Sequence, residues 1–367
     1  MTRIALAATG DPLAPETWSG TPLGVARGLR AHGAEVSGVD ATPPAPVRQL
    51  AVALAAARRR SRVDAWYTPG MHRLRSRVAA RRLGDVDGAV LMGAEFGLPS
   101  RTRYVTLSDL TLVQARATHP VFSRLSDGVF RGWQQRQREV YERAVACCAA
   151  SHWAAASLRE DYGLPASKVS VVGLGRNHEP AAAAGRTWSA PRFLFVGREW
   201  ERKHGPSVLA AFGSLRAERP DARLDVVGGH PGLRGEGVTG HGALRLEVPD
   251  EAARVRELFA TATCYVMPSE VEPFGLAYVE AAAAGVPSIA TSVGGAGTIV
   301  AEGTGLLVAP GDSAALLAAM RRLADGDVAR RMGEAARARA RLFTWERVGA
   351  RLLAALGLPG GEGAEPL

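Results

Sequence analysis

Two groups of charged residues in the second half of the chain have the residue types and spacing to do chemistry. Glu272 and Glu280 have seven residues between them, beginning with Pro273-Phe274-Gly275, which is typical of a turn. Arg198 and Lys203 follow an apolar run further upstream. A guanidinium forks onto phosphate oxygens and a lysine supplies a compact charge, whereas a carboxylate can accept hydrogen bonds from both hydroxyls of a ribose. Together the two groups predict a pocket for a sugar nucleotide.

The residues around these side chains favour a binding site over an ordinary surface. Each charge could instead face solvent on a loop or a helix, and for the Gly197-Arg198 turn alone that interpretation would suffice. The chain has 45 basic residues, but only Lys168 and Lys203 are lysines, so a lysine at position 203 is informative. The free N–H groups of the 273–275 turn, with a helix expected from about Leu276, can hold phosphate or sugar hydroxyls.

Composition is that of a globular protein with room for two domains. The chain has 367 residues, of which 47% are hydrophobic and 22% charged. No apolar run approaches the roughly 20 residues that span a bilayer. The first residues, Met1–Leu6, predict a strand and show no signal-peptide pattern, so a cytoplasmic location is expected. The adjacent Cys147 and Cys148, with a third cysteine elsewhere, fit neither a disulfide framework nor a metal site and are expected to be small buried residues.

A net charge of +9 raises the question of an anionic partner. Most arginines are scattered, but one segment is denser. It contains Arg58, Arg59, Arg60, Arg62, Arg73, Arg75, Arg77, Arg81 and Arg82. A solvated helix face is the leading interpretation, and a surface for anionic lipid or an acidic acceptor is the alternative. No aromatic residues of the kind that stack on bases are interleaved with these arginines, which argues against a nucleic-acid partner.

Strand-like and helix-like segments alternate along the whole chain, which predicts a parallel α/β architecture. The expected strands are Arg3–Thr9, Ala34–Val39, Ala89–Met92, Tyr104–Leu107, Ala144–Ala149, Lys168–Val172, Arg192–Val196, Arg223–Val227, Cys264–Met267, Ser288–Thr291 and Gly305–Val308. The expected helices include Leu23–Ala31, Val47–Arg59, Val129–Arg143, Val208–Glu218 and Leu276–Ala284. The fold class is therefore expected to be α/β, with two Rossmann-like parallel-sheet domains facing across a cleft, where ligands bind at the carboxyl ends of strands.

A change of composition gives the expected domain boundaries. Residues 1–180 form the first domain, and the alanine-, glycine- and proline-containing stretch 181–191 is the linker. Residues 192–345 form the second domain. Residues 346–356 are expected to be a helix that crosses back to the first domain, and 357–367 a disordered tail.

The second half of the chain resembles the family-4 retaining glycosyltransferases of the GT-B fold almost from end to end. The matching stretches are F-L-F-V-G-R-E-W-E-R-K-H-G, D-V-V-G-G-H-P, Y-V-M-P-S-E-V-E-P-F-G-L-A-Y-V-E-A-A-A-A-G-V-P-S-I-A-T-S-V-G-G and G-T-G-L-L-V-A-P-G-D. The resemblance implies that Arg198 and Lys203 bind the donor diphosphate and that Glu280 holds the ribose. It also implies that Glu272 and the backbone of 274–276 contact the transferred sugar, with Arg198, Lys203 and Glu272 carrying catalysis.

The first half resembles the family less closely. Trp18-Ser19-Gly20-Thr21-Pro22 looks like the loop that covers the donor phosphates, although many members have two adjacent glycines there and this chain has one. Thr21 is expected to cap the helix that follows. Ser108 and Asp109 stand where many relatives have a histidine beside the donor sugar, and with Trp18 they are the expected acceptor-binding residues. The expected donor-binding residues are Gly20, Thr21, Gly197, Arg198, Lys203, Glu272, Pro273, Phe274, Gly275, Leu276 and Glu280.

The resemblance thus implies a retaining glycosyltransferase that moves a sugar from a nucleoside diphosphate donor to a hydroxyl or amine of a small-molecule acceptor, with no metal and no cofactor. Asp85 and Asp87 have the spacing of metal-dependent transferases, but they precede a strand instead of following one and are expected to form a turn. One alternative is a membrane-associated transferase acting on a lipid or envelope glycan. Another is a non-catalytic partner that binds sugar nucleotides, against which the intact charged residues argue.

Overall fold

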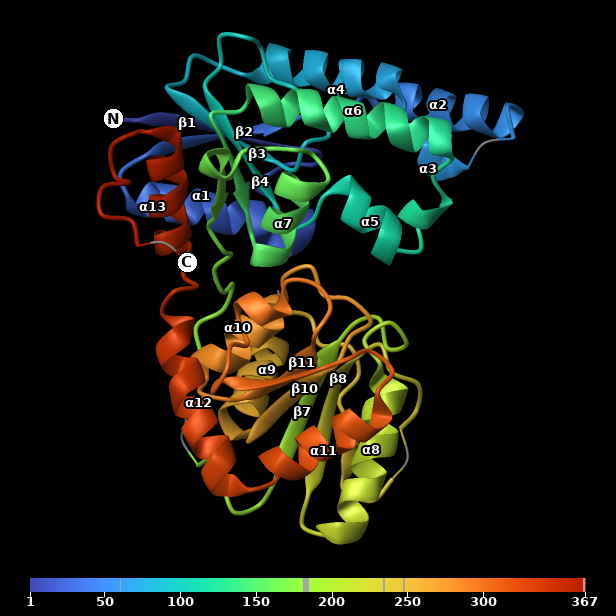
Figure 1. The fold of residues 1–367 in the computed structure, drawn as a ribbon, viewed down its shortest axis with the longest axis vertical. Helices are drawn as coiled ribbons and strands as arrows, with labels where there is room; N and C mark the ends of the chain where they lie inside the picture. The colour runs from blue at the N-terminus through green and yellow to red at the C-terminus, as the bar shows by residue number, and fades with distance from the viewer. Residues whose placement is uncertain (60, 181–184, 234, 247, 366) are drawn as a thin grey trace. The chain divides into compact units, whose positions relative to one another are not determined.

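The computed structural model describes residues 1–367 except 60, 181–184, 234, 247 and 366. It contains two compact units (Figure 1). The first is Met1–Gly175 together with Thr344–Leu367, and the second is Arg176–Phe343. The chain passes from one unit to the other at Gly175, ahead of the linker expected at 181–191, whose first residues, 181–184, lie outside the described part of the chain.

The first unit is built on a six-stranded sheet in the order β2-β1-β3-β4-β5-β6, and all neighbouring strands are parallel. The strands are β1 (Arg3–Ala8), β2 (Glu35–Asp40), β3 (Gly88–Met92), β4 (Tyr104–Ser108), β5 (Ala146–Ala149) and β6 (Val169–Val171). Strand order reverses between β1 and β3, because the chain leaves β1 toward β2 on one side and later returns to β3 on the other. The loops that follow β1 and β3 therefore diverge, and such a point is the usual ligand site of a doubly wound sheet.

The helices of the first unit are α1 (Thr21–Ala31), α2 (Ala45–Ala57), α3 (Arg62–Trp66), α4 (Pro69–Arg82), α5 (Leu112–Thr118), α6 (Asp127–Arg143), α7 (His152–Glu160) and α13 (Trp345–Leu356). Many of these helices have an N-cap residue whose side chain accepts a hydrogen bond from a backbone N–H of the first turn. These N-cap residues include Ser61, Thr68, Thr111, Ser151 and Thr344. Helix α1 differs from the expectation. Its N-cap is Gly20, in a left-handed conformation, and Thr21 is already inside the helix without capping it.

The second unit is a six-stranded parallel sheet in the order β12-β11-β10-β7-β8-β9. The strands are β7 (Arg192–Gly197), β8 (Arg223–Gly228), β9 (Val238–Gly240), β10 (Cys264–Met267), β11 (Ser288–Thr291) and β12 (Gly305–Val308). The helices are α8 (Gly205–Glu218), α9 (Pro249–Thr261), α10 (Leu276–Ala283), α11 (Ser313–Leu323) and α12 (Gly326–Ala340). Strand order reverses between β7 and β10. The prediction of two Rossmann-like parallel sheets is confirmed.

Helix α13 packs on α1 within the first unit, and glycines make the close approach possible. A Cβ at Gly28 would lie 2.0 Å from the carbonyl oxygen of Trp345, and one at Gly349 would lie 2.4 Å from the Gly28 carbonyl. Residues 357–365, which belong to the tail expected to be disordered, are instead folded against this pair. Arg351 Nε donates to the carbonyl of Glu365 at 2.7 Å, and a Cβ at Gly361 would meet the backbone of Ala354 at 2.2 Å. Small residues let this tail lie close to α13, which composition alone did not indicate.

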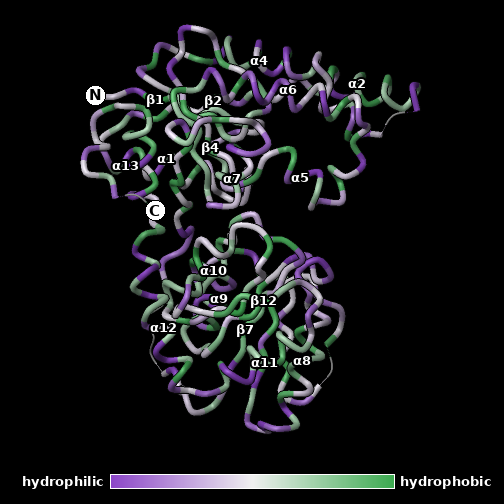
Figure 2. Tube along the Cα trace, viewed as in Figure 1, coloured by the Kyte–Doolittle hydropathy of each residue, from purple (hydrophilic) through white to green (hydrophobic). Residues whose placement is uncertain are grey.

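The hydrophobic segments follow the strands of each sheet, while helices α4 and α6 carry hydrophilic stretches (Figure 2). Cys147, Cys148 and Cys264 are free and buried, as expected, and burial raises the pKa of the Cys147 thiol to about 11. None of the helices that the structure describes combines the length and the apolar character needed to cross a bilayer.

The arginine-rich segment is mostly a solvated surface, with one exception. Arg58, Arg59, Arg62, Arg73, Arg77, Arg81 and Arg82 are exposed, and Arg60 lies outside the described residues. Arg75 is only 3% exposed. It occupies the buried stripe of α4 between Met71 and Ala79, so its assignment to a solvated face is wrong.

Candidate functional site

The loop after β7 is held by its own backbone and by one buried aromatic residue. Lys203 N donates to the carbonyl of Glu199, and Gly205 N to that of Trp200, both at 2.9 Å. Trp200 is buried and its ring centroid lies 5.3 Å from that of Phe195 on β7. A Cβ at Gly205 would lie 2.1 Å from the Trp200 ring, so only glycine fits where this loop enters α8. The loop therefore presents Lys203 from a fixed backbone.

Lys203 and Glu272 form an ion pair between the loops that follow β7 and β10. The two side chains are each 12% exposed. Glu270 N also donates to the Arg202 carbonyl at 3.0 Å, which ties the same two loops together through the backbone. These are the loops that diverge where strand order reverses, which is the expected ligand position of such a sheet. Sequence analysis gave Lys203 and Glu272 separate roles, and the structure brings them together.

Glu272 is positioned through its backbone by the segment after β11. Gly295 N donates to the Glu272 carbonyl at 2.7 Å, and Glu272 N donates to the Val293 carbonyl at 3.2 Å. Gly294 has a φ of +102°, and a Cβ there would lie 2.2 Å from the Glu272 carbonyl oxygen. Only glycine fits so close a backbone approach in this conformation. The Gly294-Gly295 pair thus forms the support beneath Glu272.

The turn after Glu272 leads directly into α10. Gly275 caps this helix in a left-handed conformation with φ +96°. Pro273 and Leu276, on either side of the turn, are half-buried, whereas the Phe274 side chain is buried with its ring centroid 6.1 Å from that of Phe343. Phe274 therefore anchors the turn with its side chain, and only its backbone can meet a ligand. The N–H groups at the start of α10 remain suited to an anion or to sugar oxygens.

Glu280 lies on α10 in a different environment from Glu272. It borders a narrow cavity lined by side chains of α9 and by residues 178–180. Among the described residues no side chain or backbone N–H donates to its carboxylate. Burial raises the pKa of the Glu280 carboxyl to about 7. A half-buried carboxylate with unused acceptor capacity can receive hydroxyl hydrogens from a ligand.

Arg198 is exposed beside this site. Within the described part of the chain, its guanidinium has no hydrogen-bond or ion-pair partner, so its donors face solvent. Gly197 precedes it at the end of β7, and a Cβ there would approach Cγ of Lys203 to 3.2 Å. The structure thus places Gly197 against Lys203 and leaves Arg198 available to a phosphate.

In the first unit, Trp18, Thr21 and Asp109 line one cavity of about 260 Å³. An adjoining cavity of about 310 Å³ shares Trp18 and Asp109 with it and reaches to Tyr67 and Glu95. These cavities lie at the carboxyl ends of β3 and β4, beside the loop between β1 and α1. They are as large as the small-molecule sites of many proteins.

The loop that carries Trp18 is strained. Trp18 and Ser19 have φ values of 47° and 53°, followed by Gly20 at 80°, so three successive residues are left-handed. For residues with a side chain this conformation costs about 1–2 kcal/mol each. Strain of this kind is concentrated at functional sites. Gly93 faces the loop, and a Cβ there would lie 3.2 Å from the Trp18 ring.

Ser108 does not line either cavity, contrary to expectation. It is 1% exposed, and its hydroxyl lies 3.5 Å from that of Tyr141, because the last residue of β4 points into the core. Glu95 was missed by sequence analysis. It follows β3 as Asp109 follows β4, so the same search for polar residues after a strand could have found it.

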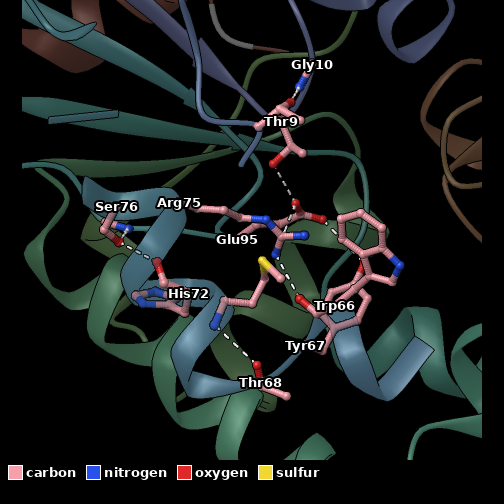
Figure 3. Close-up of polar contacts among 12 residues, drawn as sticks. Thr9, Gly10, Trp66, Tyr67, Thr68, His72, Arg75, Ser76 and Glu95 are labelled. Atoms are coloured by element: carbon pink, nitrogen blue, oxygen red, sulfur yellow. Dashed lines mark hydrogen bonds and ion pairs between the residues drawn. The ribbon is translucent and has the colours of Figure 1, made fainter. Parts of the chain in front are cut away.

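The Glu95 carboxylate is held from three sides (Figure 3). Thr9 Oγ1 donates to Oε2 at 2.8 Å, and Tyr67 OH lies 3.4 Å from Oε1. Arg75 Nη1 lies 3.9 Å from Oε2 and donates to the Trp66 carbonyl at 3.1 Å. The buried arginine therefore braces the wall of the cavity from behind.

The sequence motif of metal-dependent transferases is not a site in this structure. Asp87 accepts from the backbone N–H of Arg3 at 2.7 Å, and Asp85 accepts from its guanidinium at 2.9 Å. Both contacts lie where β1 and β3 begin, at the opposite end of the strands from the cavities. Among the described residues, no three histidine, cysteine, aspartate or glutamate side chains come together as a metal-binding group.

Comparison with known proteins shows what this chain is similar to. Residues 190–326 match the family described as glycosyl transferases group 1. The chain is 35% identical over 206 residues to a D-inositol 3-phosphate glycosyltransferase of Streptomyces coelicolor, which covers 51% of this chain and 45% of the relative. It is 32% identical over 210 residues to a glycogen synthase of Mycobacterium tuberculosis, which covers 52% and 49%. The chain thus spans about half the length of the curated relatives it matches.

A solved structure extends the likeness to the whole fold. The sucrose-phosphate synthase from Thermosynechococcus elongatus superposes with a TM-score of 0.64, covering 96% of this chain and 97% of the other at 22% identity. Two parallel sheets of this kind define the GT-B class of folds. The second half of the chain is thus similar to the glycosyl transferases group 1, in agreement with the resemblance of its motifs to family 4, and the two sheets have the GT-B fold.

Proposed function

We propose that the chain is a retaining glycosyltransferase that moves a sugar from a nucleoside diphosphate donor to a hydroxyl or amine of a small-molecule acceptor, forming an α-glycoside. The observation that carries the proposal is the ion pair of Lys203 with Glu272, formed where strand order reverses in the second sheet. It places a cation and a carboxylate together beside the turn that begins α10.

These groups suit the charge changes of glycosyl transfer. As the bond to the leaving diphosphate breaks, negative charge builds on the phosphate oxygens, and Lys203 with Arg198 would stabilise it. Because the loop backbone already fixes Lys203, little reorganisation is needed during reaction. The leaving phosphate would receive the acceptor proton on the same face, so retention needs no separate nucleophile.

Glu272 and Glu280 would hold the donor at two points. Glu272, with the backbone of the 273–276 turn, would contact the transferred sugar. Glu280 would accept hydrogen bonds from the two ribose hydroxyls, using the acceptor capacity that the described residues leave unused. The cavity beside Glu280 is only about 20 Å³, so a nucleoside would lie at its mouth or displace Leu246, which is 37% exposed.

Product analysis tests the proposal directly. The protein would be incubated with a panel of nucleoside diphosphate sugars and small polyol or amine acceptors, and the product examined by NMR. An α-linked product from an α-linked donor, formed equally with and without chelator, is the expected result. An inverted product would overturn the retaining mechanism, and a requirement for a divalent ion would overturn the metal-free one.

A second candidate, a transferase that works at a lipid surface, has one observation in its favour. On α2 the side chains of Val47, Leu50 and Leu54 are 39%, 59% and 50% exposed, and the exposed Arg58 and Arg59 follow. Apolar and basic residues on one helix are typical of binding to anionic membranes. Sedimentation with anionic vesicles tests it, using a Leu50→Asp/Leu54→Asp variant and, as control, Leu307→Asp in the second unit.

A further inference from the structure

The first unit has a cavity whose lining residues indicate which class of acceptor it could bind. The two adjoining hollows that share Trp18 and Asp109 have volumes of about 260 and 310 Å³. They lie at the point where strand order reverses between β1 and β3, with Glu95 in the loop after β3 and Asp109 directly after β4. A monosaccharide or another small cyclic polyol fits in such a volume.

The charges that line this cavity are acidic, although the chain as a whole carries +9. Of the described residues that line the two hollows, the charged ones are Glu95 and Asp109, and none is arginine, lysine or histidine. An anionic acceptor would meet two carboxylates and no cation among the lining residues, with Arg75 behind Glu95 as the nearby cation, whereas an ammonium group would be attracted. The wall therefore discriminates by charge.

Glu95 is fixed in place but keeps acceptor capacity. It receives the hydroxyls of Thr9 and Tyr67, and its side chain is 23% exposed (Figure 3). Arg75 lies 3.9 Å behind it, is 3% exposed and does not line the cavity. Each carboxylate oxygen has two lone pairs, so lone pairs remain for a ligand. A carboxylate held in this way can receive an ammonium without reorganising.

Aromatic walls complete the arrangement. Trp18, Tyr67 and Phe122 line the larger hollow. Aromatic faces pack against the C–H edges of sugar and cyclitol rings and attract cations. Trp18, whose backbone is left-handed, brings a large indole to this wall.

We propose that the acceptor is an amine-bearing cyclic polyol, an amino sugar or an aminocyclitol, whose ammonium group is bound by Glu95 with Asp109 beside it. This inference rests on the transferase activity proposed above. The proposed acceptor differs from a phosphorylated polyol such as inositol 3-phosphate, which appears in the name of the Streptomyces coelicolor relative.

Binding of matched compounds to the full chain tests the proposal. One series is glucosamine, glucose and glucose 6-phosphate, and the second is an inosamine, the corresponding inositol and its monophosphate. Titration by calorimetry or ligand-observed NMR should give the amine at least tenfold tighter binding than its hydroxyl counterpart, and weakest binding for the phosphate. Equal or tighter binding of the neutral or phosphorylated compound would overturn the proposal, whatever the variants do.

Two variants test whether Glu95 causes the preference for the amine. Glu95→Gln keeps the shape and removes the charge, so it should abolish the preference for the amine. Glu142→Gln, an exposed carboxylate of the same unit, should keep it. A preference that survives in Glu95→Gln would overturn the role of that residue.

Nucleoside diphosphate binding separates this proposal from the proposed function. Glu95→Gln should bind the nucleotide as the wild type does, which also shows that the variant is folded. If the wild type does not bind any nucleoside diphosphate, that result would instead contradict the donor site proposed in the second unit.

Discussion

In the second unit the candidate donor residues lie in two short segments, 197–203 and 272–280, whereas in the first unit the cavity is lined from separate loops around Trp18, Tyr67, Glu95 and Asp109. Both groups occupy the point where strand order reverses in their own sheet. The positions are equivalent, but the chemistry differs. The donor residues pair a cation with a carboxylate, and the charged residues of the cavity are acidic.

This difference matches the two tasks proposed for the units, binding of the donor and binding of the acceptor. A diphosphate is the same in every nucleoside diphosphate donor, so the residues that bind it can lie in a short sequence motif on a fixed backbone. An acceptor varies between enzymes, and its site is assembled from loops that tolerate change. The comparison requires a donor region that is rigid and that depends on its charges.

Removal of the Lys203 charge should have the largest effect. Lys203→Ala is expected to lower turnover at least about hundredfold, because it removes a fixed donor to charge that develops on the leaving group. Steady-state kinetics with the donor found by screening measure this. Lys168→Ala, which removes the lysine bonded to the Glu142 carbonyl in the first unit, is the matched control and should be near normal. Near-normal turnover in Lys203→Ala would remove it from the site.

The second largest effect is expected from a substitution at Gly294, which supports the backbone of Glu272. Gly294→Ala puts a Cβ 2.2 Å from the Glu272 carbonyl oxygen at a φ of +102°, so it should lower the free energy of unfolding by about 2 kcal/mol or more. Donor binding should weaken as well. Gly297→Ala lies on the same segment, with its nearest contact at 3.6 Å, and should be tolerated. Thermal unfolding of the two variants makes the comparison, and equal stability would contradict the role of Gly294.

Glu280 should give nucleotide binding a moderate dependence on pH. Burial raises the pKa of the Glu280 carboxyl to about 7, above its ordinary value, so the folded state holds the proton more tightly and this carboxyl destabilises the fold as pH rises from about 5 to 8. In the proposed site the ionised form would accept the ribose hydroxyls, so affinity should increase about tenfold between pH 6 and pH 8. In Glu280→Gln the increase should disappear.

A deoxy ligand separates this effect from other titrations. A 2′-deoxynucleoside diphosphate lacks one of the two hydroxyls and should bind more weakly than the ribonucleotide to the wild type. Calorimetry at several pH values should show that Glu280→Gln no longer distinguishes the two ligands. A variant that still distinguishes them would show that the ribose is held elsewhere.

Much of the fold could be predicted because local patterns agree with it. The strands Cys264–Met267, Ser288–Thr291 and Gly305–Val308 are short apolar runs bounded by glycine, proline or serine, and they form as expected. Strand β9 was missed because Val238–Gly240 is short, polar and at the edge of the sheet. The fold of residues 357–365 depends on contacts with α13 and with His32 after α1, and a local sequence pattern does not indicate such contacts.

In the candidate site, too, some features could be predicted from local sequence and others could not. Gly275 and Glu280 could be placed from one continuous motif and its helix. The pairing of Lys203 with Glu272 depends on strand order, because β7 and β10 are neighbours although far apart in sequence. The burial of Arg75 differs from the expectation because Arg75 lies four residues from both Met71 and Ala79, on the buried face of α4, although a guanidinium usually faces solvent.

Thermal unfolding with a panel of nucleoside diphosphates, on the wild type, Lys203→Ala and Glu95→Gln, tests the donor site most directly. A nucleotide at 100 times its dissociation constant should stabilise the wild type and Glu95→Gln by about 2.7 kcal/mol, and Lys203→Ala much less. The absence of any shift in the wild type, or an equal shift in Lys203→Ala, would contradict a donor site built on the Lys203–Glu272 pair.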